Sequence, residues 1–363
     1  MYDELQTIMV DFDCWEYVKR TPDMNVLPST WAFRIKRYPD GRVKKFKARF
    51  CARGDRQKEG IDYFETWAPV VQWSTMHIVM ILAIKLNLML VQCDITAAFI
   101  HGRVPPTETI YVHQPRGFHR GNGDKVLRLK RTLYGLKQSS RYFFQYLTKR
   151  LIKQCLTASA LDPCLFISSN LIVVIYIDDI LIYGRTAAEI DTLIDNLQKD
   201  DISLHQEGTA EGYLGVDISK EGGKIILRHE GLTKRIISAL GLDSKFSTPV
   251  DTPAKSKALG KDLDRRTASG SINYASVIGM LLYLGHSRPD ISFAMHQCAR
   301  YTHSLKQSHE DALKRIGRYL KGTLTKGLIL NPSDDFRIDC YPDADFAGLW
   351  GRDDKQDPHC VRS

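Results

Sequence analysis

A nearly continuous run of β-branched, aliphatic and tyrosine residues from 171 to 183 is interrupted by the adjacent acids Asp178 and Asp179. This pattern predicts a tight hairpin, with strands at 171–177 and 180–183 and the two carboxylates at its tip. A carboxylate buried without a partner costs several kcal/mol or shifts its pKa. We therefore expect a cation beside this pair of acids, or a turn that faces a cleft.

Elsewhere the apolar positions alternate between strand and helix periods. A short apolar strand at 88–93 ends at Asp94. A basic hairpin is predicted at 31–53, because Pro-Asp-Gly at 39–41 favours a turn. A linker between domains is predicted at 247–270, where Pro, Lys, Ser and Asp occur without periodicity. Apolar spacing predicts helices at 73–87, 137–154, 187–200, 231–240, 271–285, 289–302 and 308–322.

The composition is that of a globular protein, because 43% of the 363 residues are hydrophobic and 26% are charged. This length favours two or three domains. The net charge of +9 favours a polyanionic partner, nucleic acid first, with a generally basic soluble protein as the alternative. The apolar stretches are too short to cross a bilayer, and we expect no signal peptide. The eight cysteines lack metal-binding spacing, which indicates thiols in a reducing compartment.

Three acids, Asp94, Asp178 and Asp179, converge if their two segments are neighbours in one sheet. Carboxylates without Cys or His partners suit a hard ion, Mg²⁺ or Mn²⁺. Two such ions about 3.5–4 Å apart can activate one oxygen and stabilise the leaving oxygen in phosphoryl transfer. A solvated turn explains an Asp-Asp pair alone, but the strand-forming flanks and Asp94 favour the metal site.

Two basic segments offer groups for an anionic substrate. Strand alternation places Lys45, Lys47, Arg49 and Arg53 on one face of the basic hairpin, which suits a triphosphate. The alternative is a solvated or general nucleic-acid-binding face.

The second segment, 128–141, leads into the helix predicted at 137–154. There Gly135 allows close backbone approach, while Gln138 and Arg141 offer donors to a nucleotide or template. A solvated helix start would explain the charges of this segment but not its ordered mixture of Tyr, Gly and Gln.

Together these segments closely resemble the reverse transcriptase region of copia-type (Pseudoviridae) retrotransposon polyproteins, over about residues 25–350. The resemblance rests on motifs that occur in order: Lys47-Ala-Arg49, Ala52-Arg-Gly54, Asp62-Tyr-Phe-Glu-Thr-Trp-Ala-Pro-Val70, Gln92-Cys-Asp-Ile-Thr-Ala-Ala-Phe99, Leu133-Tyr-Gly-Leu-Lys-Gln138, Tyr176-Ile-Asp-Asp179, Tyr213-Leu-Gly-Val216, Gly279-Met-Leu-Leu-Tyr-Leu284, Arg288-Pro-Asp-Ile291 and Arg318-Tyr-Leu-Lys-Gly-Thr323.

The resemblance implies an α+β fold, the right-hand polymerase with fingers, thumb and an antiparallel palm sheet. It implies reverse transcriptase fingers, palm and the start of the thumb at 1–246, with the fingers hairpin at 31–53 and the palm at about 73–220. The linker at 247–270, a helical thumb or connection at 271–330 and a truncated start of a ribonuclease H domain at 331–363 would follow.

The resemblance also implies roles for single residues. Asp94, Asp178 and Asp179 would hold two Mg²⁺ or Mn²⁺ ions, and Phe99 would screen the sugar 2′-hydroxyl. Gln138 would touch the incoming nucleotide or template. Other implied positions are a triphosphate site at Lys36, Lys47 and Arg49, a primer grip at Tyr213, Leu214 and Gly215, and a first ribonuclease H ligand at Asp343.

The implied activity is the copying of RNA, and then DNA, into DNA from dNTPs. The partners would be an RNA or DNA template–primer and other polyprotein products, without a membrane. The location would be cytoplasmic, in a virus-like particle, and/or nuclear, and the protein would not be secreted.

Three hypotheses remain. The first is an active reverse transcriptase, with no ribonuclease H activity because carboxylates beyond Asp343 are missing. The second is a decayed transposon fragment that binds nucleic acid without polymerising; the short tail and the lack of protease and integrase motifs favour it, whereas the intact acids, Phe99 and Gln138 favour activity. The third, another palm-fold enzyme such as a nucleotide cyclase, is disfavoured by the basic hairpin and the segment around Gln138.

Overall fold

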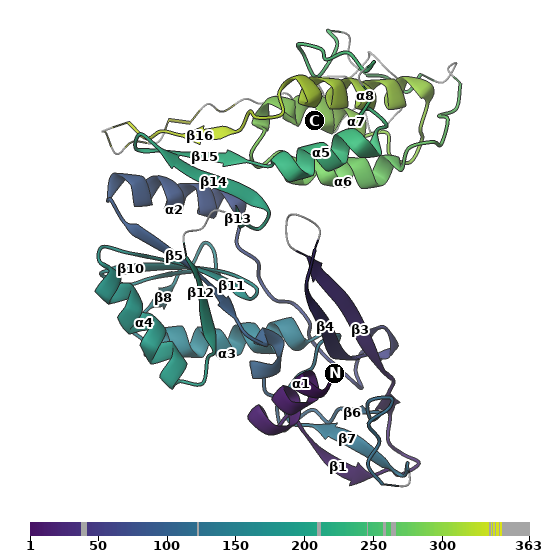
Figure 1. The fold of residues 1–363 in the computed structure, drawn as a ribbon, viewed down its shortest axis with the longest axis vertical. Helices are drawn as coiled ribbons and strands as arrows, with labels where there is room; N and C mark the ends of the chain where they lie inside the picture. Colours follow the sequence, from purple (N-terminus) through teal and green to yellow (C-terminus); the bar gives the residue numbers. More distant parts are fainter. Residues whose placement is uncertain are drawn as a thin grey trace. The chain divides into compact units, whose positions relative to one another are not determined.

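The computed structural model describes residues 1–342 except 38–41, 122, 209–211, 245, 257–258, 263–265, 334, 336, 338 and 341. The chain divides into two compact units, Met1–Thr209 and Ala210–Ser363. Both units combine helices with β-sheets, so the predicted mixture of α and β structure is confirmed (Figure 1).

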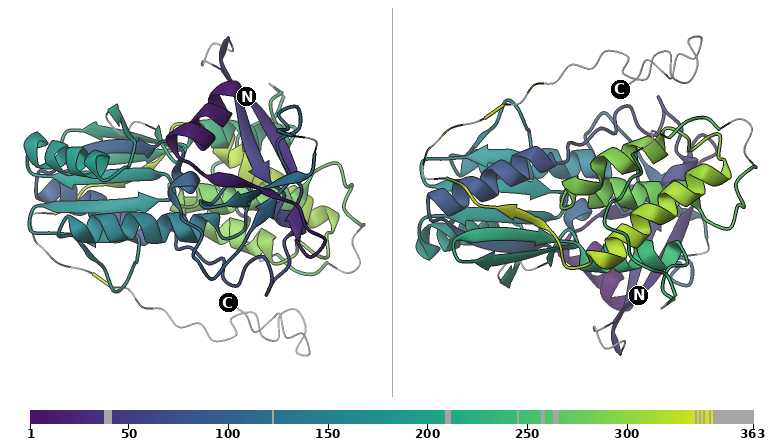
Figure 2. Two further views of the ribbon diagram at one scale, coloured as in Figure 1. Left: turned by 90° about the horizontal axis from the view of Figure 1, so that it is seen from below. Right: turned by 90° about the horizontal axis from the view of Figure 1, so that it is seen from above.

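A six-stranded sheet forms the centre of the first unit, with strand order β12-β5-β11-β10-β9-β8 and antiparallel pairs throughout. Helix α2 covers one face of this sheet, and α3 and α4 cover the other (Figures 1 and 2). The elements are α2 (Trp73–Lys85), β5 (Met89–Ile95), α3 (Ser139–Lys153), β8 (Thr157–Ala158), β9 (Leu165–Ile167), β10 (Leu171–Tyr176), β11 (Asp179–Gly184), α4 (Ala187–Lys199) and β12 (Leu204–Gly208).

The hairpin predicted at 171–183 is confirmed as β10 and β11, whose apolar side chains are largely buried between the helical layers. Its turn is tighter than predicted. Strand pairing continues to Tyr176 and Asp179, so only Ile177 and Asp178 lie outside the ladder. The sheet therefore carries one of the two acids within a strand and the other in the turn.

The remainder of the first unit is a smaller sheet, β1-β7-β6-β2, and a separate hairpin of β3 and β4. The predicted basic hairpin is confirmed, whereas its turn at 39–41 lies outside the described residues. An apolar cluster that includes Leu5, Trp15 and Phe50 joins the hairpin to this sheet. The elements are α1 (Tyr2–Gln6), a π-helix (Thr7–Asp11), β1 (Trp15–Lys19), β2 (Val26–Leu27), β3 (Ser29–Arg37), β4 (Val43–Ala52), β6 (Tyr111–Val112), β7 (Lys125–Leu129) and 3₁₀ helices at Gly54–Arg56 and Ala98–His101.

The described part of the second unit contains a sheet of order β13-β14-β15-β16, and the helices α5, α6, α7 and α8, which pack around an apolar core. The predicted helices are present, although the one predicted at 289–302 is split between a 3₁₀ turn and α7. The elements are β13 (Gly212–Tyr213), β14 (Val216–Glu221), β15 (Lys224–Arg228), α5 (Glu230–Ala239), α6 (Tyr274–Leu284), a 3₁₀ helix (Pro289–Ile291), α7 (Ser292–Ala299), α8 (Gln307–Gly322) and β16 (Leu328–Leu330).

The compact units divide near residue 209, ahead of the linker predicted at 247–270. Helices α5 and α6, on the two sides of that segment, share one core in which Ile236 and Leu281 are fully buried. Asp343, with residues 343–363 of the predicted ribonuclease H segment, lies outside the described residues. In the part of the chain that is described, no helix has the length and apolar character needed to span a membrane.

Candidate functional site

The acids Asp94, Asp178 and Asp179 come together at one end of the six-stranded sheet. Asp179 begins β11 and pairs in register with Asp94 near the end of β5. Residues directly opposite each other on antiparallel strands project from the same face of the sheet. The prediction that the segments carrying these acids are neighbours in one sheet is therefore confirmed. The side chains of Asp94 and Asp179 extend from directly opposite backbone positions. All three acids are partly exposed.

The turn that carries Asp178 has an unusual backbone. Ile177 has a φ of +57°, in the left-handed region that β-branched residues rarely adopt. The carbonyl of Asp178 accepts a hydrogen bond of 2.9 Å from the amide of Ile95, next to Asp94. Backbone strain of this kind costs about 1–3 kcal/mol and persists only where the surroundings hold it. The turn is thus fixed beside the end of β5.

The donors at this sheet end fit a hard divalent cation, because all three are carboxylates. Among the described residues, however, no three Asp, Glu, His or Cys side chains are gathered closely enough to hold a metal ion. The backbone pairs Asp94 with Asp179 and places Asp178 in the adjoining turn. Coordination by all three would require their side chains to converge further.

Phe99 lies five residues after Asp94, on the 3₁₀ helix Ala98–His101, and its ring belongs to an aromatic cluster. Its ring meets the ring of Tyr134 edge-on, with centroids 5.8 Å apart, and the ring of Phe143 at 6.3 Å. The hydroxyl of Thr132 donates to the carbonyl of Phe99. Phe99 is partly exposed, and the contacts with Thr132, Tyr134 and Phe143 hold its backbone and its ring.

Tyr134 connects this cluster to the basic hairpin, and it was not predicted as a site residue. The guanidinium of Arg49 lies over the Tyr134 ring, 4.8 Å from the centroid. Burial raises the pKa of Tyr134 to about 12; Arg49 opposes this shift, and the carboxylates of Glu4 and Asp178 add to it. Tyr134 is therefore within electrostatic reach of both Arg49 and the turn acid. In the sequence, only the motif Leu133-Tyr-Gly drew attention to Tyr134.

Lys47 and Arg49, predicted to face a triphosphate, lie two residues apart on β4 and are partly exposed. The Nε of Arg49 is buried and has no hydrogen-bond partner among the described residues. Both cations act on Glu4 of α1, whose carboxylate also accepts a 3.3 Å hydrogen bond from the amide of Phe50. Burial outweighs these contacts and raises the pKa of Glu4.

The predicted row of cations on β4 is shorter than expected. Arg53 lies beyond the end of the strand and forms a two-bond ion pair with Asp55, at 2.7 and 2.8 Å. The charge of Arg53 is therefore neutralised by Asp55. Lys36 lies opposite Lys45 in the ladder, but the side chain of Lys36 is outside the described part of the structure.

Gln138 is placed inside the protein, with none of its surface exposed. Its amide nitrogen donates to the Asp62 carbonyl at 2.8 Å, and its amide oxygen accepts from the side chain of Gln57 at 2.9 Å. Gln57 in turn accepts from the amide of Lys137 at 2.8 Å. The side chain predicted to touch a nucleotide or template thus joins the 57–62 loop to the start of α3.

Comparison with known proteins places this chain in a family. A family described as reverse transcriptase (RNA-dependent DNA polymerase) matches residues 12–255. The chain belongs to this family. The predicted resemblance to copia-type polyproteins is confirmed by two relatives, each 30% identical to this chain.

One relative is the retrovirus-related Pol polyprotein from transposon RE1 of Arabidopsis thaliana, matched over 342 residues, 92% of this chain and 23% of that protein. The other, from transposon TNT 1-94 of Nicotiana tabacum, is matched over 363 residues, 96% of this chain and 27% of that protein. The chain thus spans about a quarter of the length of these relatives. A solved foamy viral protease-reverse transcriptase in complex with double-stranded DNA aligns with a TM-score of 0.42 and 13% identity, over 88% of this chain and 48% of that one.

The residues predicted to form a primer grip, Tyr213, Leu214 and Gly215, lie at the end of β13 and in the turn that leads to β14. Tyr213 is buried and pairs with Val216, which leaves Leu214 and Gly215 as a two-residue turn. Both turn residues have positive φ, +55° and +76°, as in a type I′ hairpin. The hydroxyl of Tyr283 on α6 donates to the Leu214 carbonyl at 2.8 Å. Within its unit, this turn is therefore anchored to the helical core.

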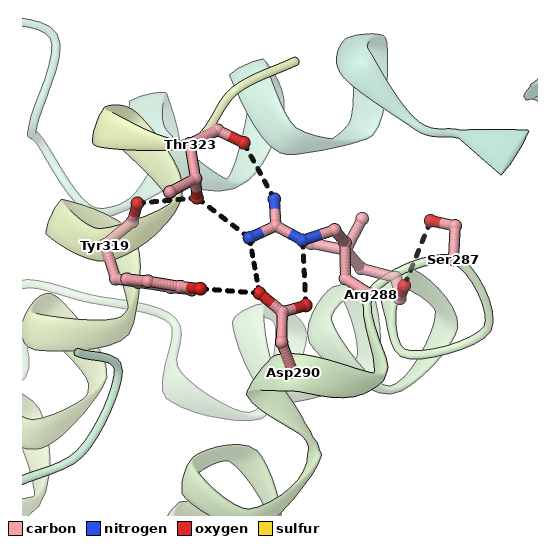
Figure 3. Close-up of polar contacts among 6 residues, drawn as sticks. Ser287, Arg288, Asp290, Tyr319 and Thr323 are labelled. Atoms are coloured by element: carbon pink, nitrogen blue, oxygen red, sulfur yellow. Dashed lines mark hydrogen bonds and ion pairs between the residues drawn. The ribbon is translucent and has the colours of Figure 1, made fainter. Parts of the chain in front are cut away.

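Two further motifs of the resemblance meet in a partly buried hydrogen-bond network of the second unit (Figure 3). Arg288, only 2% exposed, donates two hydrogen bonds to Asp290, at 2.8 and 2.9 Å. It also donates to the carbonyl and hydroxyl of Thr323, at 2.9 and 2.8 Å. Tyr319 donates to the same Asp290 carboxylate at 2.7 Å. Burial acts to raise the pKa of Asp290, but the donors Arg288 and Tyr319 outweigh it and the pKa is lowered.

The expected close backbone approach at Gly135 is confirmed. The residue has a φ of +89°, and a Cβ atom there would lie 2.2 Å from the carbonyl oxygen of Ala52. The amide of Ala52 donates to the carbonyl of Tyr134 at 2.9 Å. Gly135 thus allows the 133–136 loop to pack directly on the end of β4.

Gly135→Ala is expected to destabilise the first unit by about 1–3 kcal/mol, since it adds both a backbone clash and positive-φ strain. Urea denaturation followed by circular dichroism measures this loss. Gly117→Ala is the matched control, because Gly117 has a similar φ of +86° with nothing within 4 Å of its Cβ position. Equal losses in both variants would contradict a role for the close approach.

Proposed function

We propose that this chain is an RNA-directed DNA polymerase of a copia-type retrotransposon, which adds dNTPs to a primer 3′-hydroxyl on an RNA or DNA template. The observation that carries the proposal is the in-register pairing of Asp94 with Asp179 beside the Asp178 turn, in a member of the reverse transcriptase family. In this proposal the six-stranded sheet is the palm, the β3–β4 hairpin belongs to the fingers, and the second unit supplies thumb and connection.

Asp94, Asp178 and Asp179 would hold two divalent ions, Mg²⁺ or Mn²⁺. Such ions, when bound, supply charge neutralisation at the reacting phosphate. The protein's part is to hold the carboxylates at one sheet end, which the β5–β11 pairing supports.

The dNTP would lie between the acids and the basic hairpin. Lys47 and Arg49 would neutralise its triphosphate, with Lys36 as a further cation, and the unpartnered Nε of Arg49 supports an anionic ligand there. Phe99 would exclude the 2′-hydroxyl of an rNTP. Gln138 would act through the loop that it holds rather than by direct contact.

The template–primer would be bound largely through phosphates, as the net charge of +9 supports. The β3–β4 hairpin has two different faces. Arg34 lies opposite Lys47 on one face, whereas the other exposes apolar side chains, with Phe33 at 69% and Phe46 at 73%. Leu214 and Gly215 would contact the primer, and the buried Tyr213 would hold their turn in place. Other polyprotein products would be further partners, in a cytoplasmic virus-like particle or the nucleus.

Primer extension on poly(rA)/oligo(dT) with Mg²⁺ or Mn²⁺ tests this function directly. We expect the purified chain to incorporate dTTP, and to lose incorporation when the metal is chelated. A folded chain that binds template–primer in fluorescence anisotropy but incorporates nothing would instead support the fragment that binds nucleic acid without polymerising.

Phe99→Ala is expected to admit rNTPs, because the ring that would meet the 2′-hydroxyl is removed. The ratio of kcat/KM for dTTP over UTP should fall by roughly 10–200-fold, the range for a single steric contact. Phe12→Ala is the control, since Phe12 packs against His101, a neighbour of Phe99 on the same 3₁₀ helix. An unchanged ratio in Phe99→Ala would refute the gate assignment.

A further inference from the structure

Tyr134 contacts two residues with different roles in the proposed function, Arg49 at the triphosphate and Phe99 at the sugar. The face of its ring carries the guanidinium of Arg49, 4.8 Å from the centroid. Its ring also meets the ring of Phe99 at 5.8 Å, with the ring planes 77° apart. One side chain therefore joins the proposed triphosphate cation to the proposed sugar gate.

The backbone of Tyr134 is held by the strand that carries Arg49. The Tyr134 carbonyl accepts a 2.9 Å hydrogen bond from Ala52, and Tyr134 forms a bridge with Cys51. The close approach at Gly135 fixes the next residue against the same strand. A shift of Arg49 on β4 would therefore carry the Tyr134 ring with it.

We propose that Tyr134 is a specificity-determining positioning residue, which holds Phe99 as a rigid gate and couples sugar selection to the engagement of Arg49 by the triphosphate. This inference rests on the proposed polymerase function. The only other ring contact of Phe99 among the described residues is Phe143, at 6.3 Å, so loss of Tyr134 frees one edge of the gate. A mobile gate rejects an additional hydroxyl poorly, because rejection depends on a fixed steric contact.

Two substitutions separate the ring from the hydroxyl. Tyr134→Leu removes the aromatic platform and should lower the dTTP over UTP ratio of kcat/KM by about tenfold, while raising KM for dTTP. Tyr134→Phe keeps the ring and should leave the ratio unchanged. Tyr17→Leu is the matched control, because Tyr17 also lies under an arginine, with Arg120 at 5.2 Å, but does not contact the gate.

A double variant shows whether Tyr134 acts through Phe99. Tyr134→Leu should lower sugar selectivity no further in a Phe99→Ala background. Additive losses in the two backgrounds, or a wild-type ratio in Tyr134→Leu, would overturn the proposal. Should Tyr134→Leu fail to fold, Arg49→Met and Lys47→Met provide the test instead. Both should raise KM for dTTP, but only Arg49→Met should lower the ratio, and equal ratios would again overturn it.

The failures of the two proposals are distinguishable. Incorporation by wild type together with unchanged selectivity in the Tyr134 and Arg49 variants would overturn only the coupling. No incorporation by folded wild type would overturn the polymerase function and the coupling with it.

Discussion

Asp179→Asn is expected to reduce primer extension by about 1,000-fold or more, equivalent to about 4 kcal/mol of transition-state stabilisation. Asparagine keeps the size of the side chain but removes the negative charge that would hold a divalent ion opposite Asp94. Asp178→Asn should have a comparable effect from the turn. Single-nucleotide incorporation on poly(rA)/oligo(dT) measures the loss.

Binding of template–primer should survive in Asp179→Asn, because it depends mainly on lysine and arginine contacts to phosphate. Anisotropy titrations would then separate loss of chemistry from loss of binding. Asp191→Asn is the matched control, since Asp191 is an exposed acid on α4. An Asp179→Asn variant with more than about a tenth of wild-type activity would contradict a role for this carboxylate in holding metal.

Arg288→Met is expected to destabilise the second unit by about 1–3 kcal/mol, the range for leaving buried hydrogen-bond partners unsatisfied. The larger cost of an uncompensated buried charge does not apply, because Asp290 retains 37% of its side-chain exposure, whereas Arg288 retains 2%. The variant leaves the Thr323 carbonyl without its donor and Asp290 without its cation. Hydrogen exchange of the α6–α8 amides would report the loss within this unit.

Arg235→Met on α5 is the control, because Arg235 is exposed and its loss should change stability by no more than about 0.5 kcal/mol. Adding Asp290→Asn to Arg288→Met should recover part of the stability, because no charge is then left uncompensated. Equal protection in the Arg288→Met and Arg235→Met variants would show that the network contributes little to this unit.

Local pattern accounts for the strands and the turn that carry Asp178 and Asp179. A β-branched run with two acids at its centre favours strand, turn and strand because alternation and turn preference act over a few residues. The resemblance added the candidate roles and the family, and the family is confirmed. The shared core of α5 and α6 could not be predicted from local pattern, because it depends on contacts between residues on the two sides of the intervening segment.

The sequence by itself determined the hairpin, the identity of the three acids and the family. Only the tertiary structure decided that Asp94 stands opposite Asp179, that Gln138 is buried, and that Tyr134 joins Arg49 to Phe99. The physical reason is distance along the chain. Strand register, burial of a polar side chain and packing between rings depend on segments tens of residues apart, whose meeting no local periodicity specifies.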